Sequence, residues 1–243
     1  MSGHSKWKNI MHKKGKTDAQ RAKVFTKISK EMIIVIRDGG ADPASNSKLR
    51  DLIAKAKQNN VPNDNIERLL KRAQEGKDSN NYEAMTYEGY GKSGVGIIVE
   101  TLTDNKNRTA GEMRHYFDKF GAGLAAPGAV SWQFDKRGVI VVPKDAGGED
   151  DVMMAALDAG ALDFSTEDES YEILTAPEDF DAVRAGLTDA GFSYEYSEIE
   201  MVPQNYITVE SEDDIESMRK LLEMLEDNDD VQNVYHNMEN EPE

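Results

Sequence analysis

The sequence contains no cysteine, and its 243 residues include only four histidines. A chain without cysteine holds no disulfide framework, no thiolate metal site and no cysteine nucleophile, and this composition is typical of a reducing compartment. No apolar stretch approaches the roughly 20 residues that cross a bilayer, and the first residues lack the hydrophobic region of a signal peptide. The composition therefore favours a cytoplasmic protein without a membrane segment.

Residue patterns for catalysis or metal binding are also scarce. The histidines, at positions 4, 12, 115 and 236, lack the spacing of a zinc site. The acidic clusters lack the alternating oxygen ligands and central glycine of an EF-hand loop, so they indicate a solvated surface. Residues 89–94 match G-x-G-x-x-G, but a strand is expected after them, which favours a hairpin turn over a dinucleotide site. We therefore expect that the protein is not an enzyme and that it binds neither a cofactor nor a metal ion.

Charge is distributed unevenly along the chain. The net charge is −17, yet residues 1–80 hold 18 basic residues against 9 acidic ones, and residues 1–30 hold nine against one. Residues 145–243 hold only 3 basic residues against 30 acidic ones. A basic end on an acidic protein is typical of a surface that binds an anionic polymer. Because the charge changes twice along the chain, we expect three structural units.

The first unit, residues 1–80, is expected to be a three-helix domain. Apolar side chains recur at helical spacing after Thr17 and Gln20, which match a capping box, and the pattern ends at two glycines. Two further amphipathic helices follow, and Asn63 is expected to cap the second of these. Residues 1–16 show no apolar periodicity, so we expect an extended arm there.

The rest of the chain shows strand and helix patterns. Residues 132–201 have the order β-α-β-β-α-β, which predicts an acidic ferredoxin-like domain. The flanking pieces, residues 81–131 and 202–243, are each half a domain and are expected to close on each other to bury their apolar faces. The predicted fold class is therefore α+β, with two ferredoxin-like α/β domains, one inserted in the other. A strand at 206–209 and a polar, disordered tail at 237–243 complete the prediction.

The arm and the first helix carry most of the candidate nucleic-acid-binding residues. Cations neutralise phosphates and release counterions, and a tryptophan stacks on an exposed base. A solubilising tail, or a core position for Trp7, is the alternative interpretation. Arg108 is included because a cation in the first turn of a helix opposes the helix dipole, which suggests that it meets an anion. The candidates are Lys6, Trp7, Lys8, His12, Lys13, Lys14, Lys16, Arg21, Lys23, Lys27 and Arg108.

Several stretches of the sequence resemble the YebC/PmpR family. They are G-H-S-K-W at residues 3–7, R-A-K-V-F-T-K at 21–27, N-V-P at 60–62, Y-E-G-Y-G at 87–91 and T-D-N-K-N-R-T at 103–109. The resemblance implies three domains. The first is basic and helical, the second and third are α/β domains, and the third is inserted in the second. It also implies no catalytic activity. Members are mostly described as DNA-binding transcriptional regulators. Related members, including a mitochondrial translational activator, act on the ribosome and relieve stalling at proline-rich stretches.

Two functions are therefore expected. The leading one is a non-enzymatic, cytoplasmic transcriptional regulator whose partner is DNA. The alternative is a ribosome-associated translation factor whose basic arm and helices contact ribosomal RNA. Charge does not separate the two, because phosphate contacts look alike in DNA and RNA. The sequence leaves open the oligomeric state, the target genes and whether the acidic domain binds a protein partner.

Overall fold

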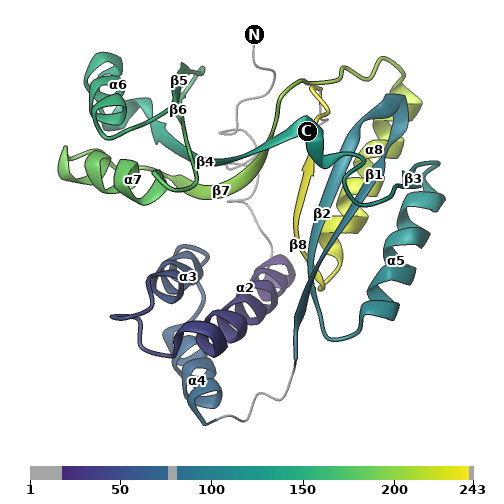
Figure 1. Cartoon of the computed structure of the whole chain (residues 1–243), viewed down its shortest axis with the longest axis horizontal. Coiled ribbons are helices and arrows are strands. Elements are labelled where there is room, and N and C mark those ends of the chain that lie inside the picture. The colour runs from purple at the N-terminus through teal and green to yellow at the C-terminus, as the bar shows by residue number, and fades with distance from the viewer. Residues whose placement is uncertain (1–17, 76–80, 241–243) are drawn as a thin grey trace.

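The computed structural model describes residues 18–75 and 81–240 of the chain. The expected N-terminal arm, Thr17 and most of residues 77–81, a polar stretch expected to link the first two units, therefore lie outside the described residues. Within them, three helices are followed by two sheets with their own helices (Figure 1). No helix of residues 18–75 and 81–240 has the length and apolar character to cross a membrane.

The N-terminal helices form a small bundle. Its buried side chains come from all three helices and include Met32, Leu49 and Ile66. Asn46 joins two helices, because its amide donates to the carbonyls of Val35 and Gly40 while its oxygen accepts from the Leu49 amide. The helices are α2 (Asp18–Gly39), α3 (Ser47–Gln58) and α4 (Asn63–Gln74).

One expectation for this bundle is wrong. Asn63 does not cap α4, because Pro62 occupies the N-cap position and no side chain caps the helix. The Pro62 carbonyl accepts from the amides of Asn65 and Ile66, so the helix starts one residue earlier than a cap at Asn63 requires, and Asn63 is its first helical residue.

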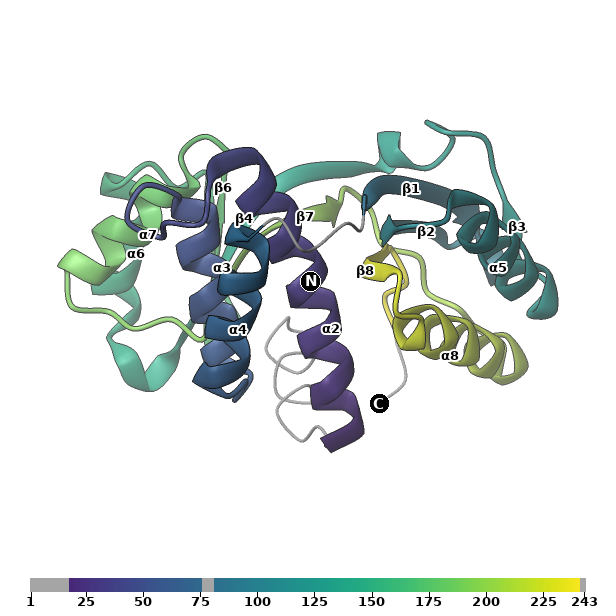
Figure 2. The same cartoon turned by 90° about the horizontal axis from the view of Figure 1, so that it is seen from below.

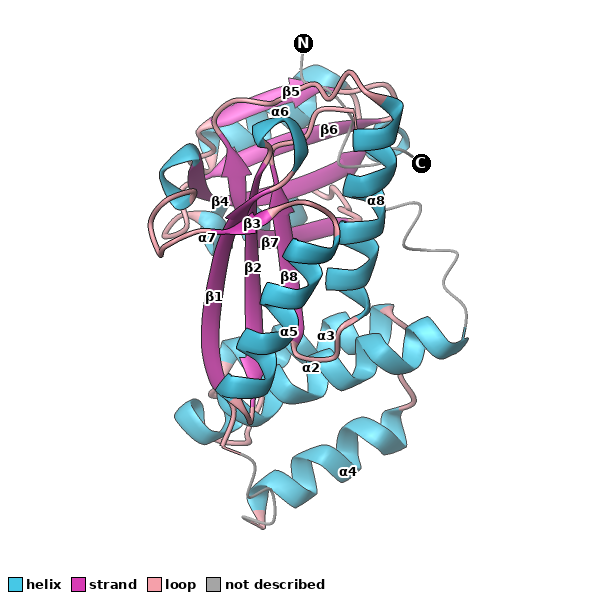
Figure 3. Cartoon of the chain, turned by 90° about the vertical axis from the view of Figure 1, so that its right-hand side faces the viewer, coloured by secondary structure: helices cyan, strands magenta, loops and turns pink. Residues whose placement is uncertain are grey.

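The first sheet is antiparallel and has the strand order β3-β1-β2-β8. Two helices, α5 and α8, lie side by side against this sheet (Figure 3). The core between them includes Phe117, Leu221 and Leu225, all fully buried. The elements are β1 (Glu83–Tyr90), β2 (Gly96–Thr103), α5 (Lys106–Lys119), β3 (Gly123–Leu124), α8 (Glu212–Asp227) and β8 (Val231–His236).

The second sheet is formed by the chain between β3 and α8. Its antiparallel strand order, β5-β6-β4-β7, is the ferredoxin-like order, and α6 and α7 cover one face around Ile140, Ile173 and Leu187. The predicted α+β class is confirmed. The elements are β4 (Phe134–Pro143), α6 (Glu149–Asp158), β5 (Asp163–Thr166), β6 (Ser170–Thr175), α7 (Phe180–Asp189) and β7 (Tyr196–Pro203).

The G-x-G-x-x-G stretch is a hairpin turn between β1 and β2. Residues Lys92–Gly94 form a single 3-10 turn, and a strand follows it rather than a helix. Gly91 packs so closely on α8 that a Cβ atom there would lie 2.4 Å from the sulfur of Met218. The glycines therefore serve the turn and its packing, because a phosphate-binding glycine loop requires a helix N-terminus immediately after it.

Two expectations near the end of the chain are wrong. Residues 206–209 form no strand, only an isolated bridge between Ile207 and Met238. Residues 237–240 are ordered rather than a disordered tail, because the buried Asn237 accepts a hydrogen bond from the Gly96 amide at 2.8 Å. Asn240 also exchanges two hydrogen bonds with the backbone of Val209. Polar side chains here replace strand pairing in closing the end of the sheet.

In the view from below, helix α2 crosses the region where the two sheets meet (Figure 2). A cluster of charged groups forms at this junction, where Lys55 of α3 pairs with Glu198 of β7 at 2.7 Å. Burial raises the pKa of the nearby Glu31 carboxyl. Burial alone would lower the pKa of Lys55, but Glu198 and Glu31 outweigh it and raise that pKa. The helical bundle is therefore attached to the acidic sheet by partly buried charges.

Candidate nucleic-acid interface

The predicted binding residues of the arm lie outside the described part of the chain. They are Lys6, Trp7, Lys8, His12, Lys13, Lys14 and Lys16. Arg21 lies on α2, but its side chain is not among those described. The structure therefore describes the side chains of only three candidates, Lys23, Lys27 and Arg108, and binding by the others stays a prediction.

Lys23 and Lys27 of α2 contact the C-terminal end of α8. The Lys23 ammonium lies 2.5 Å from the Asp227 carboxylate, and Lys27 donates to the Glu226 carbonyl at 2.7 Å. The C-terminus of a helix carries partial negative charge from its unpaired carbonyls, so it attracts cations. These two lysines thus meet an anionic surface of their own chain.

Lys30, one turn further along α2, is part of a buried polar network. It donates to the Asp230 carboxylate at 2.7 Å and to the Asp229 carbonyl at 2.8 Å. Asp230 is 4% exposed and Lys30 is 8% exposed, so this ion pair is removed from water. The other oxygen of Asp230 accepts from Arg108 at 2.6 Å and from Thr109 at 2.8 Å. One carboxylate therefore joins α2, α5 and the start of β8.

The ionisation of Asp230 reflects this environment. Burial alone would raise the pKa of the Asp230 carboxyl, but hydrogen bonds from Arg108, Lys30 and Thr109 outweigh burial and lower that pKa to about 2. The same carboxyl raises the pKa of the Arg108 guanidinium, with Asp104 adding to the effect. Asp230 and Arg108 are therefore both charged throughout the physiological pH range.

Arg108 lies in the first turn of α5, three residues after the N-cap. The cap is Asn105, whose side chain accepts from the Arg108 amide at 3.1 Å. The guanidinium lies between two carboxylates, Asp104 at 2.8 Å and Asp230 at 2.6 Å. The anion expected near this arginine is thus present within the chain. Contact with a nucleic acid stays a prediction for Arg108, whose side chain is 43% exposed.

Helices α3 and α4 carry cations that sequence reasoning did not select as binding residues. Six of them are exposed, whereas Lys55 of α3 is half-buried and pairs with Glu198 of β7. The excess of basic over acidic residues in 1–80 points to binding by this domain as a whole. Helical periodicity places these positions on the outer helix faces but does not show which of them bind. The exposed cations are Lys48, Arg50, Lys57, Arg68, Lys71 and Arg72.

A pocket of about 300 Å³ lies between α2 and α4. One face of α2 contributes Phe25, Ser29 and Ile33, which are half-buried. The facing side of α4 contributes polar and charged groups as well as apolar ones, and Tyr82 reaches the pocket from the residues before β1. The α4 residues are Asn65, Arg68, Leu69 and Arg72.

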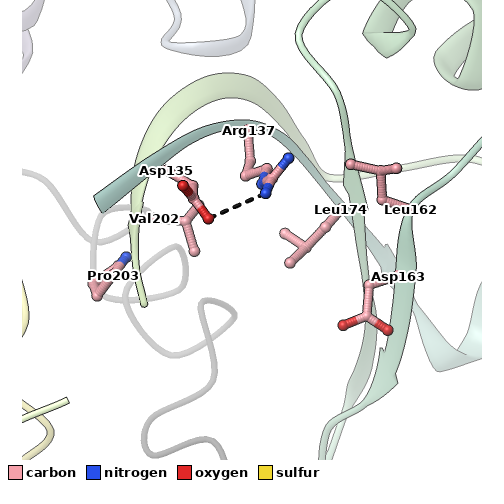
Figure 4. Close-up of a pocket in the computed structure, with 7 residues that line it drawn as sticks. All are labelled: Asp135, Arg137, Leu162, Asp163, Leu174, Val202 and Pro203. Carbon is pink, nitrogen blue, oxygen red and sulfur yellow. Dashed lines mark hydrogen bonds and ion pairs between the residues drawn. The ribbon is translucent and has the colours of Figure 1, made fainter. Parts of the chain in front are cut away.

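A second pocket, of about 230 Å³, lies on the acidic unit (Figure 4). Its guanidinium, from Arg137, points toward Asp135 and pairs with it at 3.1 Å. Gln204 donates to the other oxygen of Asp135. Because Arg137 is paired with Asp135 and Asp163 adds a second carboxylate, this pocket offers little to an anionic ligand. Among residues 18–75 and 81–240, no three histidine or acidic side chains are grouped to hold a metal ion.

Comparisons with known proteins agree along the whole chain. Residues 5–76 match the model of the TACO1/YebC protein N-terminal domain, and residues 82–238 match that of the TACO1/YebC second and third domain. A probable transcriptional regulatory protein of Acetivibrio thermocellus is 59% identical, covering 98% of each chain. One of Caldicellulosiruptor bescii is 54% identical over 100% of each chain. A crystal structure of a conserved hypothetical protein from Aquifex aeolicus superposes with a TM-score of 0.82 at 38% identity, covering 93% of each chain.

Proposed function

The chain belongs to the TACO1/YebC family, and we propose that it is a non-enzymatic transcriptional regulator that binds DNA through its N-terminal helical domain. The observation that supports this proposal is the group of exposed cations on α3 and α4 of an otherwise acidic protein. Five of them, Lys48, Arg50, Lys57, Arg68 and Lys71, make no ion pair with a described residue, so phosphates reach them without displacing an internal partner. The relatives named probable transcriptional regulatory proteins agree with it.

The test is a titration of the full-length protein with duplex DNA over a range of salt concentrations. If about six cations contact phosphates, the logarithm of the affinity falls against the logarithm of the salt concentration with a slope of about −5. An affinity that does not depend on salt, or no binding to duplex DNA at low salt, contradicts the proposal.

A second candidate function is that of a translation factor that acts on the ribosome, relieves stalling at proline-rich sequences and contacts ribosomal RNA. The pocket between α2 and α4 favours it, because aromatic and guanidinium groups around a small cavity suit unpaired bases, which ribosomal RNA displays and duplex DNA does not. Co-sedimentation of the full-length protein with ribosomes, in competition with duplex DNA, distinguishes the two functions. Binding to ribosomes that duplex DNA does not displace favours the translation factor.

The proposal divides the chain into three domains, at residues 1–80, 81–131 plus 202–243, and 132–201. The pairing of β2 with β8 supports it, because these strands come from the two ends of the split domain. Replacing residues 132–201 by a short linker is expected to leave a chain that unfolds cooperatively. Loss of the cooperative transition argues against this division.

We also propose that the acidic domain, residues 132–201, binds a protein partner. Its helix α6 exposes Met154 and Leu157, and Leu162 follows the helix with 54% of its surface exposed. Exposed apolar side chains among acidic ones are typical of an interaction surface. A Met154→Ser/Leu157→Ser variant is expected to lose a partner recovered from cell extract while its melting temperature stays unchanged. Recovery of the same partners by the variant contradicts this assignment.

A further inference from the structure

The pocket between α2 and α4 combines three kinds of groups that bind a nucleotide. Phe25 and Tyr82 supply aromatic rings, and Ile33 and Leu69 supply apolar surface. Asn65 supplies an amide that both donates and accepts hydrogen bonds. Its volume of about 300 Å³ lies at the small end of the range for ligand pockets, so it suits one base rather than a larger ligand.

The two arginines of the pocket lie on one face of α4. Arg68 and Arg72 are four residues apart, which places them one above the other on the helix surface. Both side chains are exposed, and Arg68 makes no hydrogen bond or ion pair with any residue that the structure describes. Guanidinium groups bind phosphate oxygens through paired hydrogen bonds, so this face of α4 suits a phosphate chain that passes the pocket.

Tyr82 is held in position by the network that joins the bundle to the first sheet. The Lys30 ammonium lies 5.5 Å from the centre of its ring. Lys30 is itself fixed by the buried Asp230 carboxylate. A ring fixed in this way loses little conformational freedom when a base stacks on it, which strengthens binding.

We propose that this pocket binds one unpaired nucleotide of a single nucleic-acid strand, with the base against Phe25 and Tyr82 and the flanking phosphates at Arg68 and Arg72. The inference rests on the nucleic-acid binding proposed above and adds a ligand class to it. Duplex DNA keeps its bases stacked and cannot fill the pocket, so single strands gain a contact that duplexes lack.

The first experiment measures binding of the full-length protein to a short unstructured RNA, the same strand as DNA, and the corresponding DNA duplex. Tyr82→Leu is expected to weaken single-strand binding by about five- to a hundredfold, the loss typical of one base–aromatic stack. Duplex binding is expected to stay unchanged. Tyr82→Phe keeps the ring and is expected to retain single-strand binding, which separates loss of stacking from loss of folding.

A charge-matched pair of variants forms the second experiment. Arg68→Gln/Arg72→Gln removes two cations from the pocket, and Lys57→Gln/Lys71→Gln removes two exposed cations outside it. The pocket variant is expected to lower single-strand affinity more than the control at the same salt concentration. The two variants are expected to lower duplex affinity by similar factors, because each removes the same charge.

The outcomes separate this inference from the proposed function. A wild-type protein that binds neither single strands nor duplex contradicts the proposed function and the pocket together. Binding that is unaffected by Tyr82→Leu, with no difference between the charge-matched variants, overturns the pocket alone. If the pocket variants lose affinity for both the RNA and the DNA strand, the pocket recognises the base and phosphates that the two share. If they lose affinity for only one strand, the pocket is still supported and that strand is the preferred ligand.

Discussion

The lysines of α2 and the cations of α3 and α4 lie in the same basic domain, yet their surroundings differ. Lys23, Lys27 and Lys30 contact the acidic end of α8 and the residues after it. Lys57 and Lys71 are exposed and pair with no described residue. Positive charge in a sequence therefore does not measure how much of it is available to a ligand. In this chain the lysines of α2 attach the basic domain to the first sheet and α8, whereas the exposed lysines of α3 and α4 remain available to a ligand.

The largest expected effect comes from removing the anion that holds α2. Asp230→Ala leaves Lys30 buried without its carboxylate, which is expected to cost about 3–5 kcal/mol of unfolding free energy. The matched control is Asp227→Ala, whose exposed pair with Lys23 is expected to contribute only about 0–1 kcal/mol. Chemical denaturation of both variants measures the difference. Equal losses would show that burial does not distinguish the two contacts.

Acid is expected to weaken the same attachment. Because the pKa of Asp230 is about 2 in the folded protein and 3.8 without its partners, the folded state keeps this carboxylate charged where the unfolded state binds a proton. The resulting stability, about 2 kcal/mol, is present above pH 4 and is lost as the pH falls toward 2. Unfolding free energies of wild type and Asp230→Asn are measured from neutral pH downward. The gap between them is expected to narrow in acid, and a constant gap contradicts this assignment.

Nucleic-acid binding provides a third test of the comparison. Lys57→Ala/Lys71→Ala removes two open cations and is expected to reduce the slope of log affinity against log salt by about 1.8 on duplex DNA. Lys23→Ala/Lys27→Ala removes two cations that must first leave the end of α8, so its effect is expected to be less than half as large. A larger effect for the α2 pair would show that these lysines bind phosphate in preference to α8.

The smallest effect is expected at the junction of Glu31 and Lys55. Burial disfavours the Glu31 carboxylate, so Glu31→Gln is expected to change the unfolding free energy by less than about 1 kcal/mol, in the stabilising direction. Lys55→Gln removes the partner of Glu198 and is expected to destabilise the protein. Thermal melts at neutral pH compare the two. A destabilising Glu31→Gln would mean that its charge attaches α2.

Arg108 separates a structural role from a binding role. Arg108→Ala removes the charged donor from one oxygen of the buried Asp230 carboxylate, which Thr109 still contacts, and is expected to lower the melting temperature, with binding of duplex DNA by the folded protein unchanged. Asp104→Ala is the control, because it removes the more exposed partner of the same guanidinium. A variant that keeps its melting temperature but loses ribosome association supports ligand contact by Arg108.

Local patterns in the sequence predicted most elements of the fold. Alternating apolar residues and nearby turn residues predict strands at 83–90 and 231–236, and β1 and β8 span these same ranges, because short strands of this kind are defined locally. The expected strand at 206–209 failed because its pairing depends on residues near 238, not on its own pattern. Asn237 looked like a tail residue, since its partner Gly96 lies 141 residues away.

The candidate site was harder to predict for the same reason. Arg108 does meet anions, as its place in the first helical turn predicts, but the buried one, Asp230, lies 122 residues further along the chain. Lys30 was not selected as a site residue, and its partner lies 200 residues away. The pocket between α2 and α4 depends on how two helix faces meet Tyr82, which no periodicity reports.

The place of β8 beside β2 has a consequence for how the chain folds as it is synthesised. Tyr235 of β8 contacts Glu100 of β2 across 135 residues of sequence, and Lys30 of α2 is separated from its partner Asp230 by 200 residues. Contacts of such high sequence separation form slowly, because a long loop must close first. The acidic unit between them is complete before β8 leaves the ribosome. We therefore expect the helical bundle and the acidic unit to fold before the first sheet, whose completion by β8 and whose attachment to α2 require the end of the chain.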